Sequence, residues 1–252
     1  MRKKIIFVLT LLSLLISVSS CKKSPLTNGK VVTETREISA FDTLYLYDNI
    51  DVTLICSDTY KIEITTGENL LPNIISESNG EMLLLRNDNI CNWLRSYDCP
   101  LEAKIYYKSG IKSIIYESVG DLTSDTYIGN DTLSRFDLNI ENGSGNIDLK
   151  INSDNIYVKA HDGTNEIKME GTADYIYIYQ IGLGPIDILG LPTKKADIYL
   201  YGSNDIYVNC SKTLNANIYD LGDIYYKGQP EIKSNISPDA LGRLIEIENL
   251  KN

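Results

Sequence analysis

The sequence has almost none of the side chains on which enzyme and metal sites most often depend. Of its 252 residues one is His, one is Trp and three are Met, and its five Cys form no Cys-x-x-Cys pair. A structural zinc site needs closely spaced Cys or His ligands, and a Ser-His-Asp triad needs a His beside its nucleophile. The only His, His161, has no second His and no nucleophile motif to work with. We therefore predict no catalytic residues, no metal site and no cofactor.

Positive charge and helical periodicity are also scarce. The chain has 24 Lys and Arg against 34 Asp and Glu, which gives a net charge of −10. Such an acidic body argues against a nucleic-acid partner and against attachment to anionic lipid through basic patches. No window of eleven or more residues spaces its apolar residues as a helix would, whereas β-branched and aromatic residues are abundant. The composition predicts an all-β protein that does not bind nucleic acid.

The one long apolar run, residues 5–16, is too short to cross a membrane, because a spanning helix needs roughly 20 apolar residues. It follows three basic residues and leads to Val18-Ser-Ser-Cys21, which resembles a bacterial lipobox. This pattern predicts that residues 1–20 are a lipoprotein signal peptide and that Cys21 receives acyl chains. The alternative is an ordinary signal peptide followed by a chance Cys.

The sequence thus predicts three segments along the chain. Residues 1–20 are the signal peptide, residues 21–32 are the lipidated Cys and a tether, and residues 33–252 are a single β-solenoid domain. Two or more acyl chains give stable anchoring, so the membrane is a predicted partner through the N-terminus. We expect an outer-membrane lipoprotein of a Gram-negative bacterium. Lys22-Lys23, which carries no acidic export pattern, favours its periplasmic side over the cell surface.

From residue 145 onward the chain repeats about every twenty residues. The repeat consists of two interleaved series of isoleucines: Ile147, Ile167, Ile186, Ile206 and Ile224 form the first, and Ile156, Ile176, Ile198 and Ile218 form the second. A period of this size is typical of solenoids, in which each coil buries its apolar face only by stacking on its neighbours.

Each repeat alternates like a strand. In Tyr175-Ile-Tyr-Ile-Tyr179 the isoleucines share one face and the tyrosines the other. Stacked coils then place the aliphatic side chains inside and pair each strand in parallel with its equivalent about 4.8 Å away. The pattern predicts a parallel β-helix, or β-solenoid, of about eleven coils, with residues 231–248 capping its open end.

Three further segments resemble a known family. They are Gly143-Ser-Gly-Asn-Ile-Asp148, Val119-Gly-Asp-Leu122, and an N-terminal element Phe41…Asn49-Ile-Asp-Val52…Gly67-Glu-Asn-Leu-Leu71. Together, behind a lipobox, they resemble the bacterial "putative auto-transporter adhesin, head GIN domain" family over residues 33–230. The resemblance implies a β-helical exported lipoprotein and brings no catalytic residues with it.

The outward positions offer a candidate binding surface. One Tyr follows each isoleucine of the second series, and these four are expected to stack in one line: Tyr157, Tyr177, Tyr199 and Tyr219. Tyr has an apolar ring and a polar tip, which suit a glycan or a protein ligand. The alternative is a structural ladder, in which stacked rings stabilise the parallel sheet. We expect a non-catalytic binding, adhesin-like or structural role in the envelope; a part in envelope assembly is equally compatible.

An enzyme is the rival hypothesis. Asp148 and Asp187 occupy equivalent outward positions two coils apart, about 10 Å from each other. That separation is near the carboxylate spacing of inverting glycoside hydrolases, which would make the protein a polysaccharide hydrolase or lyase. Lys168 lies between the two aspartates, so an ion-pair ladder on a solvated face is the simpler interpretation.

Four cysteines remain after Cys21. Cys91 and Cys99 enclose a short stretch in the least repetitive part of the chain, and an exported protein can oxidise them to a local disulfide. Cys56 and Cys210 are expected to be buried as small apolar residues.

Overall fold

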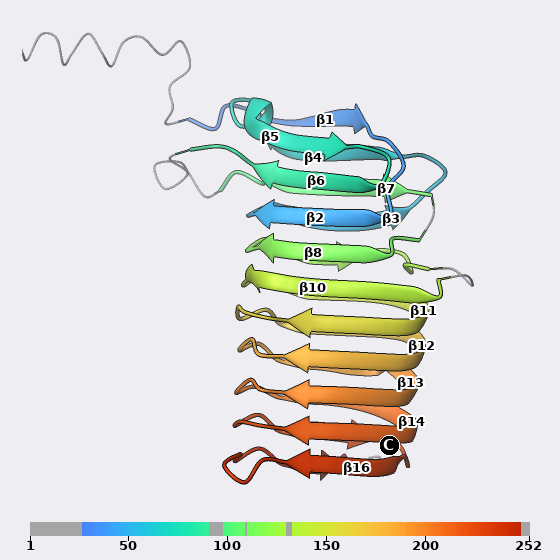
Figure 1. The fold of residues 1–252 in the computed structure, drawn as a ribbon. Coiled ribbons are helices and arrows are strands. Elements are labelled where there is room, and N and C mark those ends of the chain that lie inside the picture. The colour runs from blue at the N-terminus through green and yellow to red at the C-terminus, as the bar shows by residue number, and fades with distance from the viewer. Residues whose placement is uncertain (1–26, 91–97, 109, 130–132, 248–252) are drawn as a thin grey trace, which may run out of the picture.

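The structure, a computed structural model, describes residues 27–90, 98–108, 110–129 and 133–247, and it is built almost entirely of β-strands (Figure 1). Strands make up 62% of the described residues, and one 3₁₀ turn, η1 (Leu71–Asn73), is the only helical element among them. The predicted all-β class and the parallel solenoid are both confirmed.

The N-terminal half contains nine short strands: β1 (Val31–Glu37), β2 (Thr43–Asp48), β3 (Asp51–Cys56), β4 (Lys61–Gly67), β5 (Ile74–Ser78), β6 (Met82–Asn87), β7 (Glu102–Tyr107), β8 (Ser113–Ser118) and β9 (Leu122–Ser124). The C-terminal half contains longer ones: β10 (Arg135–Gly143), β11 (Ile147–Ala160), β12 (Ile167–Gln180), β13 (Ile186–Leu200), β14 (Ile206–Ile218), β15 (Ile224–Lys227), β16 (Glu231–Ile236) and β17 (Leu244–Glu246).

Two parallel sheets enclose the core. Strands β11 to β14 each bend midway, so that their first halves lie in one sheet and their second halves in the other. We call one of them the tyrosine sheet. It runs in the order β6, β2, β8, β10, the second halves of β11 to β14, and β16. The opposite sheet runs β7, β3, β9, the first halves of β11 to β14, β15 and β17.

The solenoid has about seven turns, not the eleven expected. The difference arises in the N-terminal part, where strands are not stacked in chain order. The β2–β3 pair lies between β6–β7 on one side and β8–β9 on the other. Strands β1, β4 and β5 pair antiparallel and add no turn. Regular winding therefore begins only at β8.

The core is a set of aliphatic ladders. The isoleucines of the first series lie opposite one another in consecutive turns, and all five are at most 1% exposed. Burying such side chains is the main stabilising contribution, since each removes its apolar surface from water at about 25 cal/mol per Å². The predicted inward face is confirmed.

Small residues fill the inner corner at which the long strands bend. Ser153, Ala173, Thr193 and Cys210 lie opposite one another at this corner and are buried. The Ser153 hydroxyl donates to the Asn155 carbonyl at 3.1 Å, and the Cys210 thiol donates to the Thr213 carbonyl at 3.1 Å. These bonds satisfy backbone carbonyls of the bends to which the two side chains belong. The predicted burial of Cys210 is confirmed.

One glycine shows how closely successive turns approach. Gly171 has a φ of 132°, and a Cβ atom there would collide with the Ile151 carbonyl of the preceding turn. Only glycine combines this backbone angle with so little space.

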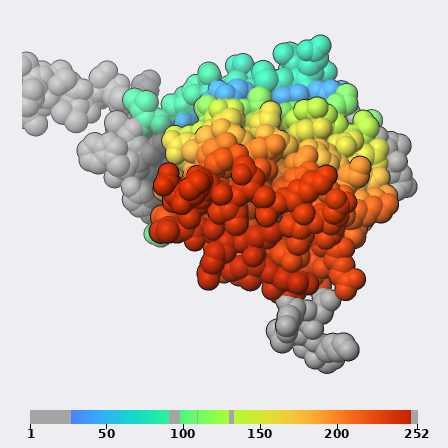
Figure 2. Space-filling view, turned by 60° about the horizontal axis from the view of Figure 1, so that its bottom comes forward, coloured from blue at the N-terminus to red at the C-terminus, as the bar shows by residue number. Residues whose placement is uncertain are grey.

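The two ends of the solenoid differ. Antiparallel β1 and β4 cover the N-terminal end on one sheet. At the other end the segment predicted as a cap forms one more turn, β16 and β17, which Figure 2 shows in red. The inward positions of that turn are open: Ile232 is 40% exposed and Ile236 is 44% exposed. None of the helical structure in the described ranges is long and apolar enough to cross a membrane.

We predict that Ile178→Ala lowers the free energy of unfolding by about 2–5 kcal/mol, because it removes a side chain that is fully buried between two turns. Ile181→Ala is the matched control, since Ile181 lies just beyond the same strand and is 42% exposed. Urea denaturation followed by circular dichroism measures both. Equal losses for the two variants would contradict the inward ladder.

Two core tyrosines give a pH-dependent prediction. Burial is the main reason that the pKa of Tyr107 and that of Tyr116 are each raised to about 12. The unfolded chain ionises Tyr near pH 10, so stability that is complete below pH 10 is lost as pH rises toward 12. The Tyr116 hydroxyl donates to the Gly120 carbonyl at 2.5 Å, whereas the Tyr107 hydroxyl lies near Thr126 but makes no hydrogen bond of good geometry among the described residues.

Tyr107→Phe is therefore expected to unfold with an unchanged free energy at pH 7 and to be more stable than the wild type at pH 11. Tyr116→Phe is expected to lose about 1 kcal/mol at pH 7, because it loses a hydrogen bond. Denaturant titrations at the two pH values compare the variants. A Tyr107→Phe protein as destabilised at pH 7 as Tyr116→Phe would refute the assignment.

Candidate binding surface

The four tyrosines predicted to stack in one line lie on the tyrosine sheet, but not in one register. Tyr157 lies opposite Tyr177, as expected. In the next turn Tyr177 lies opposite Asp197, and Tyr199 lies opposite Tyr179. The single line is therefore wrong. Its cause is Ala196, which occupies the inward position opposite Ile176, where the isoleucine pattern had suggested Ile198.

The rings instead form two diagonals across the sheet. In the first diagonal, Tyr157, Tyr177 and Tyr199, consecutive ring centroids lie 5.9 and 5.6 Å apart. In the second diagonal, Tyr179, Tyr201 and Tyr219, the corresponding distances are 5.5 and 4.2 Å. Three of the four predicted residues thus share one diagonal, and Tyr219 belongs to the other. Three of these four distances lie in the range of about 4.5–7 Å that is favourable for aromatic pairs, and the rings of the closer pair, Tyr201 and Tyr219, are nearly parallel.

Polar groups surround the first diagonal. The Tyr175 hydroxyl donates to Asp197 at 2.7 Å, and the Asn215 amide donates to the other oxygen of the same carboxylate. Burial, followed by this carboxylate, raises the pKa of Tyr175, so its hydroxyl stays a donor at neutral pH. Asp197 is thereby held in a fixed orientation between the tyrosines and the asparagines of β14.

A shallow hollow of about 290 Å³ begins at this carboxylate. Asp197, Tyr199, Asn215, Asn217 and Lys233 line it. The Asn217 amide is directed to the Ile198 carbonyl at 3.1 Å, which leaves its own oxygen as an acceptor. The arrangement offers a ring face beside fixed donors and acceptors, which suits a ligand with many hydroxyl groups and an apolar side.

At the opposite end of the first diagonal lies a cation. The Arg135 guanidinium lies 4.0 Å from the centroid of the Tyr157 ring and makes two hydrogen bonds to Asp137, at 2.6 and 2.7 Å. The salt bridge raises the pKa of Arg135, which remains charged. One edge of the diagonal is therefore closed by an ion pair rather than by an apolar side chain.

The aspartate pair of the enzyme hypothesis lies on the opposite sheet. Asp148, Lys168 and Asp187 face one another in successive turns, as the spacing predicted. One oxygen of Asp187 accepts the Leu189 backbone N–H at 2.9 Å, so this carboxylate supports its own strand. His161 follows the end of β11, with its ring 6.0 Å from that of Tyr179. Within the described ranges, no three His, Cys, Asp or Glu side chains group as metal ligands would.

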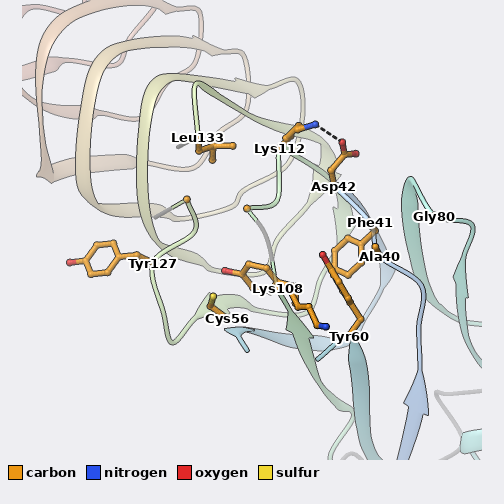
Figure 3. A pocket seen from close by; sticks show the side chains of 13 residues that line it. Ala40, Phe41, Asp42, Cys56, Tyr60, Gly80, Lys108, Lys112, Tyr127 and Leu133 are labelled. Atoms are coloured by element: carbon orange, nitrogen blue, oxygen red, sulfur yellow. Dashed lines mark hydrogen bonds and ion pairs between the residues drawn. The ribbon is translucent and has the colours of Figure 1, made fainter. Parts of the chain in front are cut away.

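A second hollow, of about 620 Å³, was missed by the sequence reasoning (Figure 3). It lies at the junction between the N-terminal strands and the regular turns, and we call it the junction hollow. Its lining comes from connections far apart in sequence, including Phe41, Cys56, Tyr60, Lys108 and Leu133. No motif links these residues, and the only signal in the sequence was that the twenty-residue period is interrupted here.

The cysteine predictions have different outcomes. Cys56 is only partly buried and lines the junction hollow, so its predicted burial is wrong. Cys99 is also partly buried, but Cys91 lies outside the described residues, and the disulfide stays a prediction. Cys21 and the signal peptide lie outside them too.

Comparison with known proteins gives a family and a fold. No curated protein matches the chain. A "putative adhesin" of Bacteroides fragilis is 21% identical, with a TM-score of 0.77 over 88% of this chain and 99% of that one. A "putative adhesin" of Parabacteroides distasonis is 18% identical, with a TM-score of 0.67 over 88% and 99%.

A "putative lipid binding protein" of the same species is 24% identical, with a TM-score of 0.62 over 88% and 98%. At these identities the structures are similar in fold. The family model described as "Putative auto-transporter adhesin, head GIN domain" matches residues 40–230, and the chain belongs to this family.

Proposed function

We propose that the protein is a non-catalytic, envelope-anchored binding protein that holds a glycan against the first diagonal. The observation that supports this most is the arrangement at Asp197, where a fixed carboxylate and two amides lie beside the Tyr199 ring. Sugars present both hydroxyl groups and an apolar ring face, which matches these two kinds of contact. The names of the similar structures, adhesin among them, agree with a binding role.

The shape of the surface favours binding over catalysis. The hollow on the tyrosine sheet is shallow, so recognition would use several contacts spread over neighbouring turns. Asp148 and Asp187, the pair that would serve a hydrolase, lie on the other sheet with a lysine between them. Nothing in their surroundings favours the enzyme over the ion-pair ladder.

Anchoring through acyl chains on Cys21 completes the proposal. A lipobox behind a basic and apolar leader supports it, as does the tether that separates Cys21 from the first strand, β1. We propose the outer membrane of a Gram-negative bacterium as the location. The lateral sheets would then remain accessible to ligands around a tethered body.

We expect the double substitution Tyr177→Ser and Tyr199→Ser to weaken glycan binding at least tenfold, or about 1.4 kcal/mol, because it removes two adjacent rings. The matched control is Tyr207→Ser with Tyr225→Ser, which removes a stacked pair on the opposite sheet, with centroids 4.8 Å apart. A glycan array of bacterial and host polysaccharides, followed by titration of the best ligand, measures the effect. Unchanged binding by a folded double variant, or equal losses in both, would refute the proposed site.

Cys21→Ser tests the anchor separately. Expressed with its leader in a Gram-negative host, the wild-type chain is expected in the detergent phase of a Triton X-114 partition and the variant in the aqueous phase. Intact-mass analysis should show the added acyl chains on the wild type alone. Detergent-phase recovery of both proteins would argue against lipidation at Cys21.

A further inference from the structure

The junction hollow lies where connecting segments separate from the sheets. Its wall is formed by the segment before β2, the connection from β3 to β4, the connection from β7 to β8, and the residues that flank β9 and β10. The volume of about 620 Å³ lies within the range of about 300–1,000 Å³ that is usual for sites of small molecules.

One wall of the hollow is apolar and aromatic. The rings of Phe41 and Tyr60 meet edge to face, with centroids 6.1 Å apart, and Figure 3 shows them side by side. Phe41 is only 3% exposed, so it is held firmly by the core behind it. Leu133 lies on the other side of the hollow in the same view. A ligand between them would need an apolar body.

The rim of the hollow is positive, although the chain as a whole is acidic. Among the described residues that line it, the charged ones are Lys108, Lys112 and Asp42, which gives one net positive charge against −10 for the whole chain. Lys112 forms an ion pair with Asp42 at 2.9 Å, and this contact lowers the pKa of Asp42. Lys108 has no carboxylate partner among the described residues, and its amine lies 6.0 Å from the Tyr60 ring centroid.

We propose that the junction hollow binds a small organic carboxylate with an apolar body. The apolar part lies between Phe41, Tyr60 and Leu133, and the carboxylate is held by Lys108, with Lys112 as a second cation at the rim. A ligand must therefore have both a negative charge and an apolar body. The lysines select against neutral and cationic molecules, and the aromatic wall selects against short anions. This inference does not rest on the glycan-binding proposal, which concerns the tyrosine sheet.

The experiment uses the full chain carrying Cys21→Ser, so that no acyl chain competes with the probe. Octanoate is titrated by isothermal calorimetry and compared with 1-octanol, octyltrimethylammonium and acetate. Octanoate is expected to bind at least tenfold more tightly than each of the other three. Equal binding of octanol would reduce the hollow to an unselective apolar cavity, and no binding of octanoate at millimolar concentration would overturn the proposal.

Variants locate the site. Lys108→Gln with Lys112→Gln is expected to weaken octanoate binding at least tenfold. The matched control is Lys212→Gln with Lys194→Gln: both lysines are exposed on later turns, and Lys194, like Lys112, pairs with an aspartate. Far-ultraviolet circular dichroism verifies that all the variants are folded.

Leu133→Asp, at a partly buried wall position, adds a negative charge beside the proposed apolar body and should also weaken binding. Octanoate binding that survives both the lysine variant and Leu133→Asp, or that falls equally in the control, would place it elsewhere.

Discussion

Parallel pairing between successive turns is the constraint on which the rest of the structure depends. Each strand from β10 to β15 finds its hydrogen-bond partners in the turn before and the turn after it, mostly about twenty residues away. A turn of different length would move inward side chains outward, since one residue of slip reverses the face of every side chain. The shift between Lys168 and Glu170 lies within the first half of β12, whereas the shifts on either side of Thr193 lie at the bend of β13.

This constraint explains what the sequence could and could not predict. Ile147 and its equivalents showed the inward ladder directly, because isoleucine recurs at nearly every turn. The second series failed at two steps: Ala196 rather than Ile198 meets Ile176, and Ala216 rather than Ile218 meets Ile198. The inward position was kept there, but a smaller side chain occupied it. The register of Tyr177 and Tyr199 therefore needed the structure, although their outward direction did not.

The junction hollow lay beyond sequence reasoning for a different reason. Its residues come from connections whose course is set by the out-of-order stacking of β2–β3, and short connections carry little pattern of their own. Cys56 shows the consequence: it is the last residue of the alternating strand β3 and was expected to be buried, yet it only packs against the edge of the core and lines the hollow. Periodicity predicts ladders, whereas the spaces between irregular connections depend on long-range contacts.

The position of β2 and β3 also sets an order of events when the chain folds. β2 pairs with β6, about forty residues later, and with β8, about seventy residues later, so its two neighbours must both be present before it is enclosed. Turns from β10 onward need only the preceding twenty residues, and contacts of short range close at a lower entropic cost. A chain that emerges N-terminus first from an export channel would therefore hold its earliest strands incomplete for longest. The C-terminal turns would then form one by one, each by pairing with the exposed strands of the preceding turn.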